Sequence, residues 1–198
     1  MSQDGVNHGR RTLLVGATAA VGAVGAGFVA VPFVKSWTPS EKAKAAGAPA
    51  KVDISKLEPG AMLTAEWRGK PVYVARRSDD ALQTLSTLSD QLKDPSNANK
   101  AQQPDYADNE GRSRRPEVIV LLGVCTHLGC APKYFAEVKP EPFDPEWKGG
   151  WFCPCHGSKF DLAGRVFAGS PASDNLEVPP HSYESDNVVV IGIDEENA

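Results

Sequence analysis

The sequence has few of the residues that carry most redox and metal chemistry. Its 198 residues include only four cysteines, four histidines and two methionines. It also lacks an excess of positive charge, because 21 basic and 25 acidic side chains leave a formal net charge of −4. That balance argues against a nucleic-acid-binding protein. The even number of cysteines is consistent with either a metal site or disulfides.

One long segment lacks charge altogether. No Asp, Glu, Lys or Arg occurs among the 23 residues from Thr12 to Val34. A helix of that length spans about 30 Å of hydrocarbon. We therefore predict a transmembrane anchor at 12–34, preceded by a cytoplasmic tail at 1–11. The alternative is a cleaved signal peptide, whose apolar region is usually only about 7–15 residues long.

Two arginines directly precede the uncharged segment. Arg10-Arg11 and the residues after them resemble a twin-arginine export signal, although Gly9 stands where a polar residue is usual. Ordinary positive-inside charge is the alternative interpretation. Both interpretations predict a single-pass protein of the bacterial inner membrane, with its N-terminus in the cytoplasm and its C-terminal domain in the periplasm.

The scarce cysteines are concentrated in two short boxes. The first box is Cys125-Thr126-His127-Leu128-Gly129-Cys130, and the second is Cys153-Pro154-Cys155-His156-Gly157-Ser158. Thiolate and imidazole are the ligands of zinc, iron and copper. A mononuclear zinc site would need four of the six Cys and His groups, and a two-iron cluster would also need four. Composition leaves both centres open.

Read together, the two boxes resemble the Rieske iron–sulfur proteins, in which two histidines replace two cysteines on one iron of a 2Fe-2S cluster. The resemblance implies that two thiolates hold one iron and two imidazoles hold the other, namely Cys125, Cys153, His127 and His156. It also implies a disulfide between Cys130 and Cys155. Such a bond would cross-link loops that have little core beneath them.

The resemblance also assigns roles to side chains near the boxes. Ser158 matches the serine that donates a hydrogen bond to a bridging sulfide, which favours the reduced cluster. Phe160 stands where many members have a tyrosine, so we expect a lower reduction potential here. The segment 170–173, Ser-Pro-Ala-Ser, lies where the family has Gly-Pro-Ala-Pro, a rigid loop that covers the cluster.

The fold class expected for residues 52–198 is all-β, a Rieske-type antiparallel β-sandwich with a cluster-binding subdomain and one helix in a connecting loop. The ranges that lead to this expectation are a hairpin at 61–68 and 71–76, a helix at 78–93, a polar surface loop at 94–116 and an apolar strand at 117–124. Arg112, Arg114 and Arg115 in that loop are interpreted as solvated charge, with contacts to a partner as the alternative. His181 is interpreted as a surface or structural histidine.

The resemblance implies an electron-transfer subunit of a bacterial quinol–cytochrome c oxidoreductase, with cytochrome b and a c-type cytochrome as partners. His156 would be the first group to meet quinol, Leu128 would help to form the docking surface unless it packs within its loop, and residues 35–51 would be a flexible hinge. The alternatives are the small subunit of a periplasmic arsenite oxidase, a soluble oxygenase ferredoxin and a structural zinc module.

Overall fold

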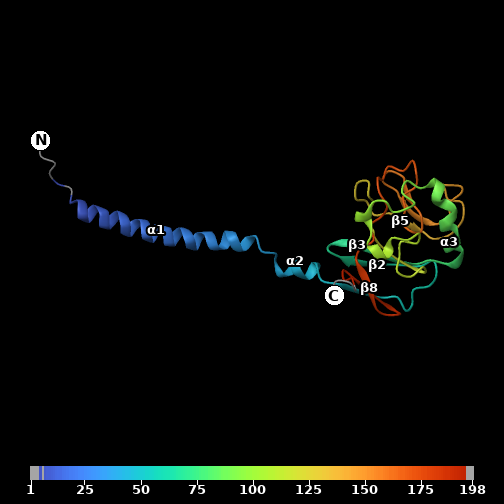
Figure 1. Ribbon diagram of the computed structural model, residues 1–198, viewed down its shortest axis with the longest axis horizontal. Coiled ribbons are helices and arrows are strands. Elements are labelled where there is room, and N and C mark those ends of the chain that lie inside the picture. The colour runs from blue at the N-terminus through green and yellow to red at the C-terminus, as the bar shows by residue number, and fades with distance from the viewer. Residues whose placement is uncertain (1–4, 6, 195–198) are drawn as a thin grey trace. The chain divides into compact units, whose positions relative to one another are not determined.

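The computed structural model describes residue 5 and residues 7–194 (Figure 1). By its internal contacts the chain divides into two units, one that ends at Ala45 and one that begins at Ala46. The helices of the first unit are α1 (His8–Ser36) and the start of α2 (Glu41–Ala46). The strands of the second unit are β1 (Ala50–Asp53), β2 (Met62–Trp67), β3 (Lys70–Arg76), β4 (Val118–Leu122), β5 (Lys133–Phe135), β6 (Gly150–Cys153), β7 (Ser158–Phe160), β8 (His181–Ser185) and β9 (Val188–Ile191).

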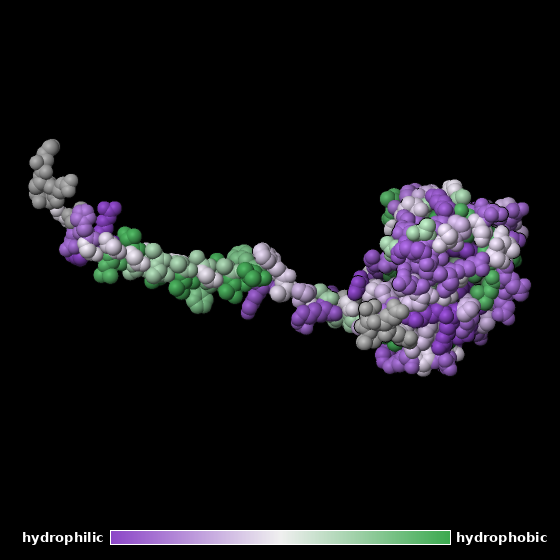
Figure 2. Space-filling view, in the orientation of Figure 1, coloured by the Kyte–Doolittle hydropathy of each residue, from purple (hydrophilic) through white to green (hydrophobic). Residues whose placement is uncertain are grey.

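Helix α1 contains the whole of the predicted apolar helix. It begins earlier than expected because the Asn7 side chain accepts a hydrogen bond from the Arg10 N–H at 3.1 Å, which caps the helix. Residues 8–11 of the predicted tail are therefore helical, whereas residues 1–4 and 6 lie outside the described residues. By length and composition α1 could cross a membrane, and Figure 2 shows apolar side chains along much of it.

Helix α2 lies within the predicted hinge at 35–51. Its single turn and a half is supported at the surface by an ion pair between Glu41 and Lys44 at 2.7 Å. Such an exposed pair contributes only about 0.3–0.5 kcal/mol. The helix ends before Pro49, which cannot extend it.

Every strand pair in the described part of the second unit is antiparallel, which confirms the predicted all-β class. The sheets have the orders β1-β9-β8, β2-β3-β4 and β5-β6-β7. The predicted hairpin is formed by β2 and β3, and its turn is Arg68-Gly69. Both residues have a positive φ, of 52° and 70°, as a tight turn between twisted strands requires.

The predicted helix at 78–93 consists of an α-helix followed by a 3₁₀ helix. It begins as α3 (Asp79–Thr84), which Ser78 caps, and continues as the 3₁₀ helix η1 (Leu85–Gln91). Leu82, Leu85 and Leu88 recur every three residues, which is the period of a 3₁₀ helix. The leucine pattern thus identified the buried side of the segment but not the type of helix.

The prediction of solvated charge in the loop at 94–116 is wrong for Arg112. The segment holds the short 3₁₀ turns η2 (Lys100–Gln102) and η3 (Asp105–Ala107), and Arg112 is completely buried. The Arg112 guanidinium donates to the carbonyl oxygens of Ala163 and Gln102, at 3.2 and 3.1 Å. Polarity predicted exposure, but a guanidinium can be buried when backbone acceptors surround it.

His181 is also buried, so the structural alternative of its prediction holds and the surface one is wrong. Its Nδ1 lies 2.9 Å from the carbonyl oxygen of Pro179 and 3.1 Å from the Tyr106 hydroxyl. Desolvation lowers the pKa of His181 to about 4. The residue therefore contributes to the core as a neutral imidazole.

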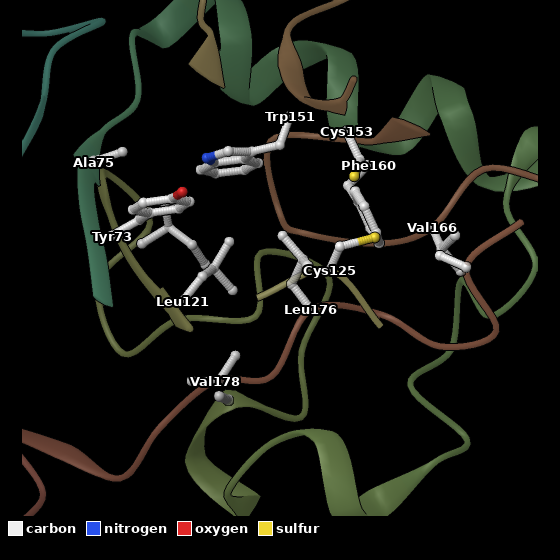
Figure 3. Close-up of a cluster of buried hydrophobic side chains, with 13 residues drawn as sticks. Tyr73, Ala75, Leu121, Cys125, Trp151, Cys153, Phe160, Val166, Leu176 and Val178 are labelled. Atoms are coloured by element: carbon white, nitrogen blue, oxygen red, sulfur yellow. The ribbon is translucent and has the colours of Figure 1, made fainter. Parts of the chain in front are cut away.

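The two largest apolar clusters organise the domain. One joins β1, β2, β3, β4 and β9, and the other extends from β3 and β4 to the two boxes (Figure 3). The second core includes Trp151 and Phe160, both fully buried. Its position directly beneath the boxes gives them a rigid base.

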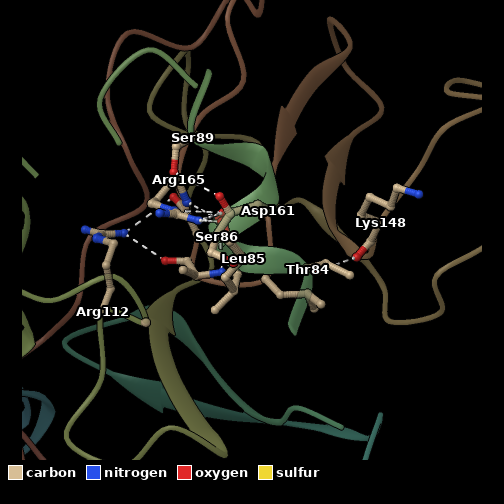
Figure 4. Close-up of polar contacts among 12 residues, drawn as sticks. Thr84, Leu85, Ser86, Ser89, Arg112, Lys148, Asp161 and Arg165 are labelled. Carbon is tan, nitrogen blue, oxygen red and sulfur yellow. Dashed lines mark hydrogen bonds and ion pairs between the residues drawn. The ribbon is translucent and has the colours of Figure 1, made fainter. Parts of the chain in front are cut away.

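A buried ion pair fixes the chain beyond the second box. Arg165 and Asp161 point toward each other in Figure 4, with Arg165 Nη2 2.7 Å from Asp161 Oδ2. Arg165 also donates to the Leu85 carbonyl oxygen at 2.8 Å. The turn after β7 is thereby joined to η1, which holds this side of the second box in place.

Candidate metal centre

Strands deliver both boxes to one place. The first box follows β4 after two residues, and the second box is the loop of the β6–β7 hairpin, in which Cys153 and Ser158 are paired. The backbone N–H of Cys125 donates to the Cys130 carbonyl oxygen at 2.8 Å, which closes the first loop on itself. Each box is therefore a closed loop whose two ends are held together.

The two loops share one backbone feature. The N–H of Gly129 donates to the carbonyl oxygen of Cys125, and that of Gly157 donates to the carbonyl oxygen of Cys153, both at 2.9 Å. The two glycines have φ values of 82° and 79°, which other residues adopt at a cost. The equal spacing from cysteine to glycine thus produces two similar turns.

The two free thiols lie on the buried side of the loops. Cys125 and Cys153 are each only 2% exposed and belong to the same apolar cluster as Phe160 (Figure 3). Burial raises the pKa of the Cys153 thiol, and the adjacent Cys125 sulfur raises it further. The two sulfurs are therefore neighbours, shielded from water.

The two histidines of the boxes meet on the outer side. The rings of His127 and His156 lie edge to face, with their centroids 4.8 Å apart and their planes at 90°. His127 is half-buried, whereas His156 is exposed. The loops thus bring two imidazoles together and leave one of them open to a partner molecule.

A disulfide joins the loops, as the resemblance implies. It links Cys130 of the first box to Cys155 of the second. The sulfur of Cys153 lies within 4.8 Å of both disulfide sulfurs. Those two sulfurs are bonded to each other, so they supply no thiolate to a metal. Two thiols and two imidazoles remain as donors in the boxes.

This donor set fits a 2Fe-2S centre of mixed ligation. Rieske centres take two cysteines on one iron and two histidines on the other, and here the thiols and the imidazoles are each paired in space. A Cys₂His₂ zinc site would use the same four side chains. The geometry of the boxes therefore admits both metals, and the choice depends on relatedness.

Ser158 lies where its hydroxyl can act on such a centre. It is fully buried, and its Oγ accepts a hydrogen bond from the Ala172 N–H at 3.0 Å. A hydroxyl that accepts one bond still has a proton to donate. The Ala172 bond fixes the oxygen and leaves the hydroxyl proton free to be donated.

Sequence reasoning missed Tyr73, which lies far from both boxes in the chain. Its hydroxyl donates to the carbonyl oxygen of Pro132 at 2.9 Å, two residues after the first box. A Cβ at Gly123 would lie 2.5 Å from its ring, so the glycine before the box makes room for it. A tyrosine in an apolar strand gives no local signal of that contact.

Leu128 projects from the first loop and is 72% exposed. The alternative that it packs within its own loop is therefore wrong. A single exposed leucine is common on protein surfaces. Leu128 directly follows His127 in the first box, so it lies beside a candidate ligand.

Comparisons with known proteins agree with the donor chemistry. Residues 99–180 match the family model described as Rieske [2Fe-2S] domain, and residues 1–40 match one described as Ubiquitinol-cytochrome C reductase Fe-S subunit TAT signal. The ubiquinol-cytochrome c reductase iron-sulfur subunit of Allochromatium vinosum is 54% identical over 100% of this chain and 95% of its own. That of Rhodospirillum rubrum is 38% identical over 96% of each.

Among solved structures, a chain of a hyperthermophilic respiratory Complex III is 28% identical, with a TM-score of 0.46. The match covers 89% of this chain and 98% of that one. The sequence matches, rather than this looser structural likeness, decide between the two metals. They identify the centre as a Rieske [2Fe-2S] cluster and not as zinc.

Proposed function

Because this chain belongs to the family of ubiquinol-cytochrome c reductase iron–sulfur subunits, we propose that it passes electrons singly from a quinol to a c-type cytochrome. Members of the family are components of an oxidoreductase complex. The relatives reported above do not favour the arsenite oxidase alternative, since each of them is named as a quinol–cytochrome c reductase subunit.

Four side chains of the boxes would hold the cluster, and they are Cys125, His127, Cys153 and His156. When bound, the cluster supplies a one-electron acceptor that two neutral imidazoles make more oxidising than four thiolates would. The apolar cluster around the thiols excludes water from that side. The disulfide keeps the two loops, and hence the two pairs of ligands, together.

His156 would be the residue that meets the quinol. One nitrogen of an imidazole ligand binds the metal, and the other is left to accept a hydrogen bond and then a proton from the quinol hydroxyl. The observation that carries this proposal is the exposure of His156 beside two almost completely buried thiols. Leu128, also exposed, would form part of the surface that docks at the quinol site.

The twin-arginine signal and the apolar α1 fit a membrane-anchored subunit. We propose that residues 12–34 cross the inner membrane once, after a cytoplasmic tail at 1–11, and that residues 52–198 lie in the periplasm. Residues 35–51 would be the hinge between the two. Cytochrome b, with its quinol site, and cytochrome c₁ would be the partners within the complex.

The test is an EPR spectrum of membranes that contain the protein, reduced with ascorbate, with and without an inhibitor of the quinol-oxidising site. We expect a rhombic Rieske signal whose shape changes with the inhibitor, because the exposed imidazole would lie beside the quinone pocket. A His156→Cys variant is the matched comparison. It keeps a metal ligand but removes the outer nitrogen. Because a third thiolate lowers the potential of the cluster, this variant is reduced with dithionite, and its spectrum should not respond to the inhibitor.

Two results would contradict the proposal. A Rieske signal indifferent to the inhibitor in the unaltered protein would separate the cluster from a quinone pocket. The absence of any Rieske signal would contradict the cluster itself and restore the zinc interpretation.

A further inference from the structure

The loop at 170–174, which we call the cover loop, is bonded to both boxes. On one side the Thr126 hydroxyl of the first box donates to the Asp174 carbonyl oxygen at 2.6 Å. On the other side the Ala172 N–H donates to Ser158 Oγ of the second box at 3.0 Å. The cover loop therefore bridges the two boxes, and any motion of it would reach the Ser158 hydroxyl.

Little in the cover loop's own sequence keeps it rigid. Pro171 is its single proline, and the Ser173 hydroxyl donates a hydrogen bond to the neighbouring Asp174 carboxylate at 2.6 Å. A proline ring fixes φ at one residue only. The conformation of the remaining residues must be held by contacts with other parts of the domain.

Lys93 supplies such a contact from outside both boxes. Its Nζ donates to the carbonyl oxygens of Ser170 and Ala172, each at 2.6 Å. These carbonyls flank Pro171, so one ammonium group fixes the curvature of the cover loop at its middle. Hydrogen bonds from a charged donor are shorter and stronger than those between neutral groups.

The backbone of Lys93 is itself well anchored. Its N–H donates to the Val166 carbonyl oxygen at 2.9 Å, and the preceding Leu92 is buried in an apolar cluster with Phe167. The carbonyl oxygen of Asp94, the next residue, accepts from the Asn175 side chain at 3.1 Å. Because the backbone of Lys93 is held in place, its ammonium group can restrain the cover loop.

We propose that Lys93 is a positioning residue for the cluster site. By holding the carbonyls of Ser170 and Ala172, it keeps the Ala172 N–H on Ser158 Oγ, and so keeps the Ser158 proton directed toward the boxes. The redox consequence rests on the proposed function. The restraint of the cover loop by Lys93 does not rest on the proposed function, because it depends only on contacts within the polypeptide.

The experiment compares the full chain, in its complex, with three variants. Lys93→Met keeps the length of the side chain but removes its charge and its hydrogen-bond donors. Lys93→Arg keeps the charge and the donors. Lys100→Met is the matched control, because Lys100 lies in the same segment but pairs with Asp108 at the surface. Hydrogen–deuterium exchange of the peptide that contains Ala172 reports on the cover loop directly.

In Lys93→Met we expect the Ala172 amide to exchange about tenfold faster or more, as the loss of a hydrogen bond to a charged group implies. Lys93→Arg should recover most of the protection, and Lys100→Met should exchange like the unaltered protein. The midpoint potential of the cluster should fall in Lys93→Met, remain near normal in Lys93→Arg, and not change in Lys100→Met.

Unchanged exchange at Ala172 in Lys93→Met would overturn the proposal. So would a potential that falls equally in Lys93→Arg, because that variant retains the charge and the donors. Loss of the Rieske signal from the unaltered protein would instead contradict the proposed function. The exchange measurement would still decide whether Lys93 holds the cover loop.

Discussion

Phe160 shows how a single side chain can set the chemistry of the centre. It is fully buried in the cluster that contains Cys125 and Cys153 (Figure 3). Its ring gives those sulfurs an apolar neighbour but no proton donor. A sulfur that carries more negative charge after reduction would be stabilised by a donor, and the sequence provides none at this position.

We therefore expect Phe160→Tyr to raise the midpoint potential by roughly 40 mV, which corresponds to about 1 kcal/mol of added stability for the reduced state. The measurement is an EPR-monitored redox titration. Thermal unfolding of the variant serves as the control for overpacking, since Phe160 is completely buried. A potential that stayed the same or fell would refute this account of Phe160.

His181 gives the domain a dependence on pH. Its side chain is buried, and Arg114 and Asp194 are the charged groups that act on it, with opposite effects on its pKa. Because burial lowers the pKa from 6.5 to about 4, the unfolded chain binds a proton at a higher pH than the folded chain does. The stability that depends on neutral His181 is therefore fully present above pH 6.5, and it is lost as the pH decreases toward 4.

The expected loss across that window is roughly 3 kcal/mol, from a shift of about 2.5 pKa units at 1.36 kcal/mol each. The measurement is the free energy of unfolding in urea at pH 7 and at pH 4.5. His181→Gln cannot take up the proton and should lose less stability between the two pH values. Parallel losses in both proteins would assign the acid sensitivity to other groups.

At the scale of elements, the turn after β7 is held by buried charge. Asp161 accepts hydrogen bonds from the N–H groups of Ala163 and Arg165, at 2.9 and 2.8 Å, and pairs with the Arg165 guanidinium (Figure 4). Arg77 and Arg112 are buried nearby, and the Asp161 charge opposes the lowering of their pKa values that burial causes. One carboxylate thus balances several buried cations.

Asp161→Asn should destabilise the domain by about 3 kcal/mol, because it leaves the Arg165 charge buried without its partner. A loss of this size would lower the melting temperature by roughly 10 °C. Thermal unfolding followed by circular dichroism measures it. Asp186→Asn is the control, since the Asp186 side chain is 95% exposed in its pair with Arg115 and should change the melting temperature little. Equal melting temperatures for the two variants would contradict this role for Asp161.

At the scale of the whole molecule, the chain consists of two units joined near Ala45. The join lies in α2, which is short, solvent-exposed and made mostly of Ala and Lys. A helix of six residues is unstable by itself in water, so the segment can change conformation at small cost. That property is what a hinge between anchor and domain would need.

Placing prolines in this segment, as Ala43→Pro with Ala45→Pro, should slow quinol–cytochrome c turnover severalfold, because each proline removes backbone freedom. The EPR amplitude of the cluster should be unaffected. Ala43→Ser with Ala45→Ser is the control for altered side chains. Normal turnover in the proline variant would contradict a moving domain.

The sequence by itself determined which ligand types the centre offers. Four cysteines, two histidines and two glycines occur in two boxes of six residues each, and ligand type and loop closure depend on residues close together in the chain. The long uncharged segment likewise predicted α1, because helix length and hydropathy are local properties.

Tertiary structure alone decided which polar side chains are buried and what they hold. Arg112 looked like a surface residue, the sequence left His181 as either a surface or a structural residue, and Lys93 gave no signal at all. The bonds from Lys93 to the cover loop join residues 77 and 79 positions apart. Whether a charged group is solvated or buried depends on acceptors that distant segments bring to it, and no local pattern records where those segments will meet.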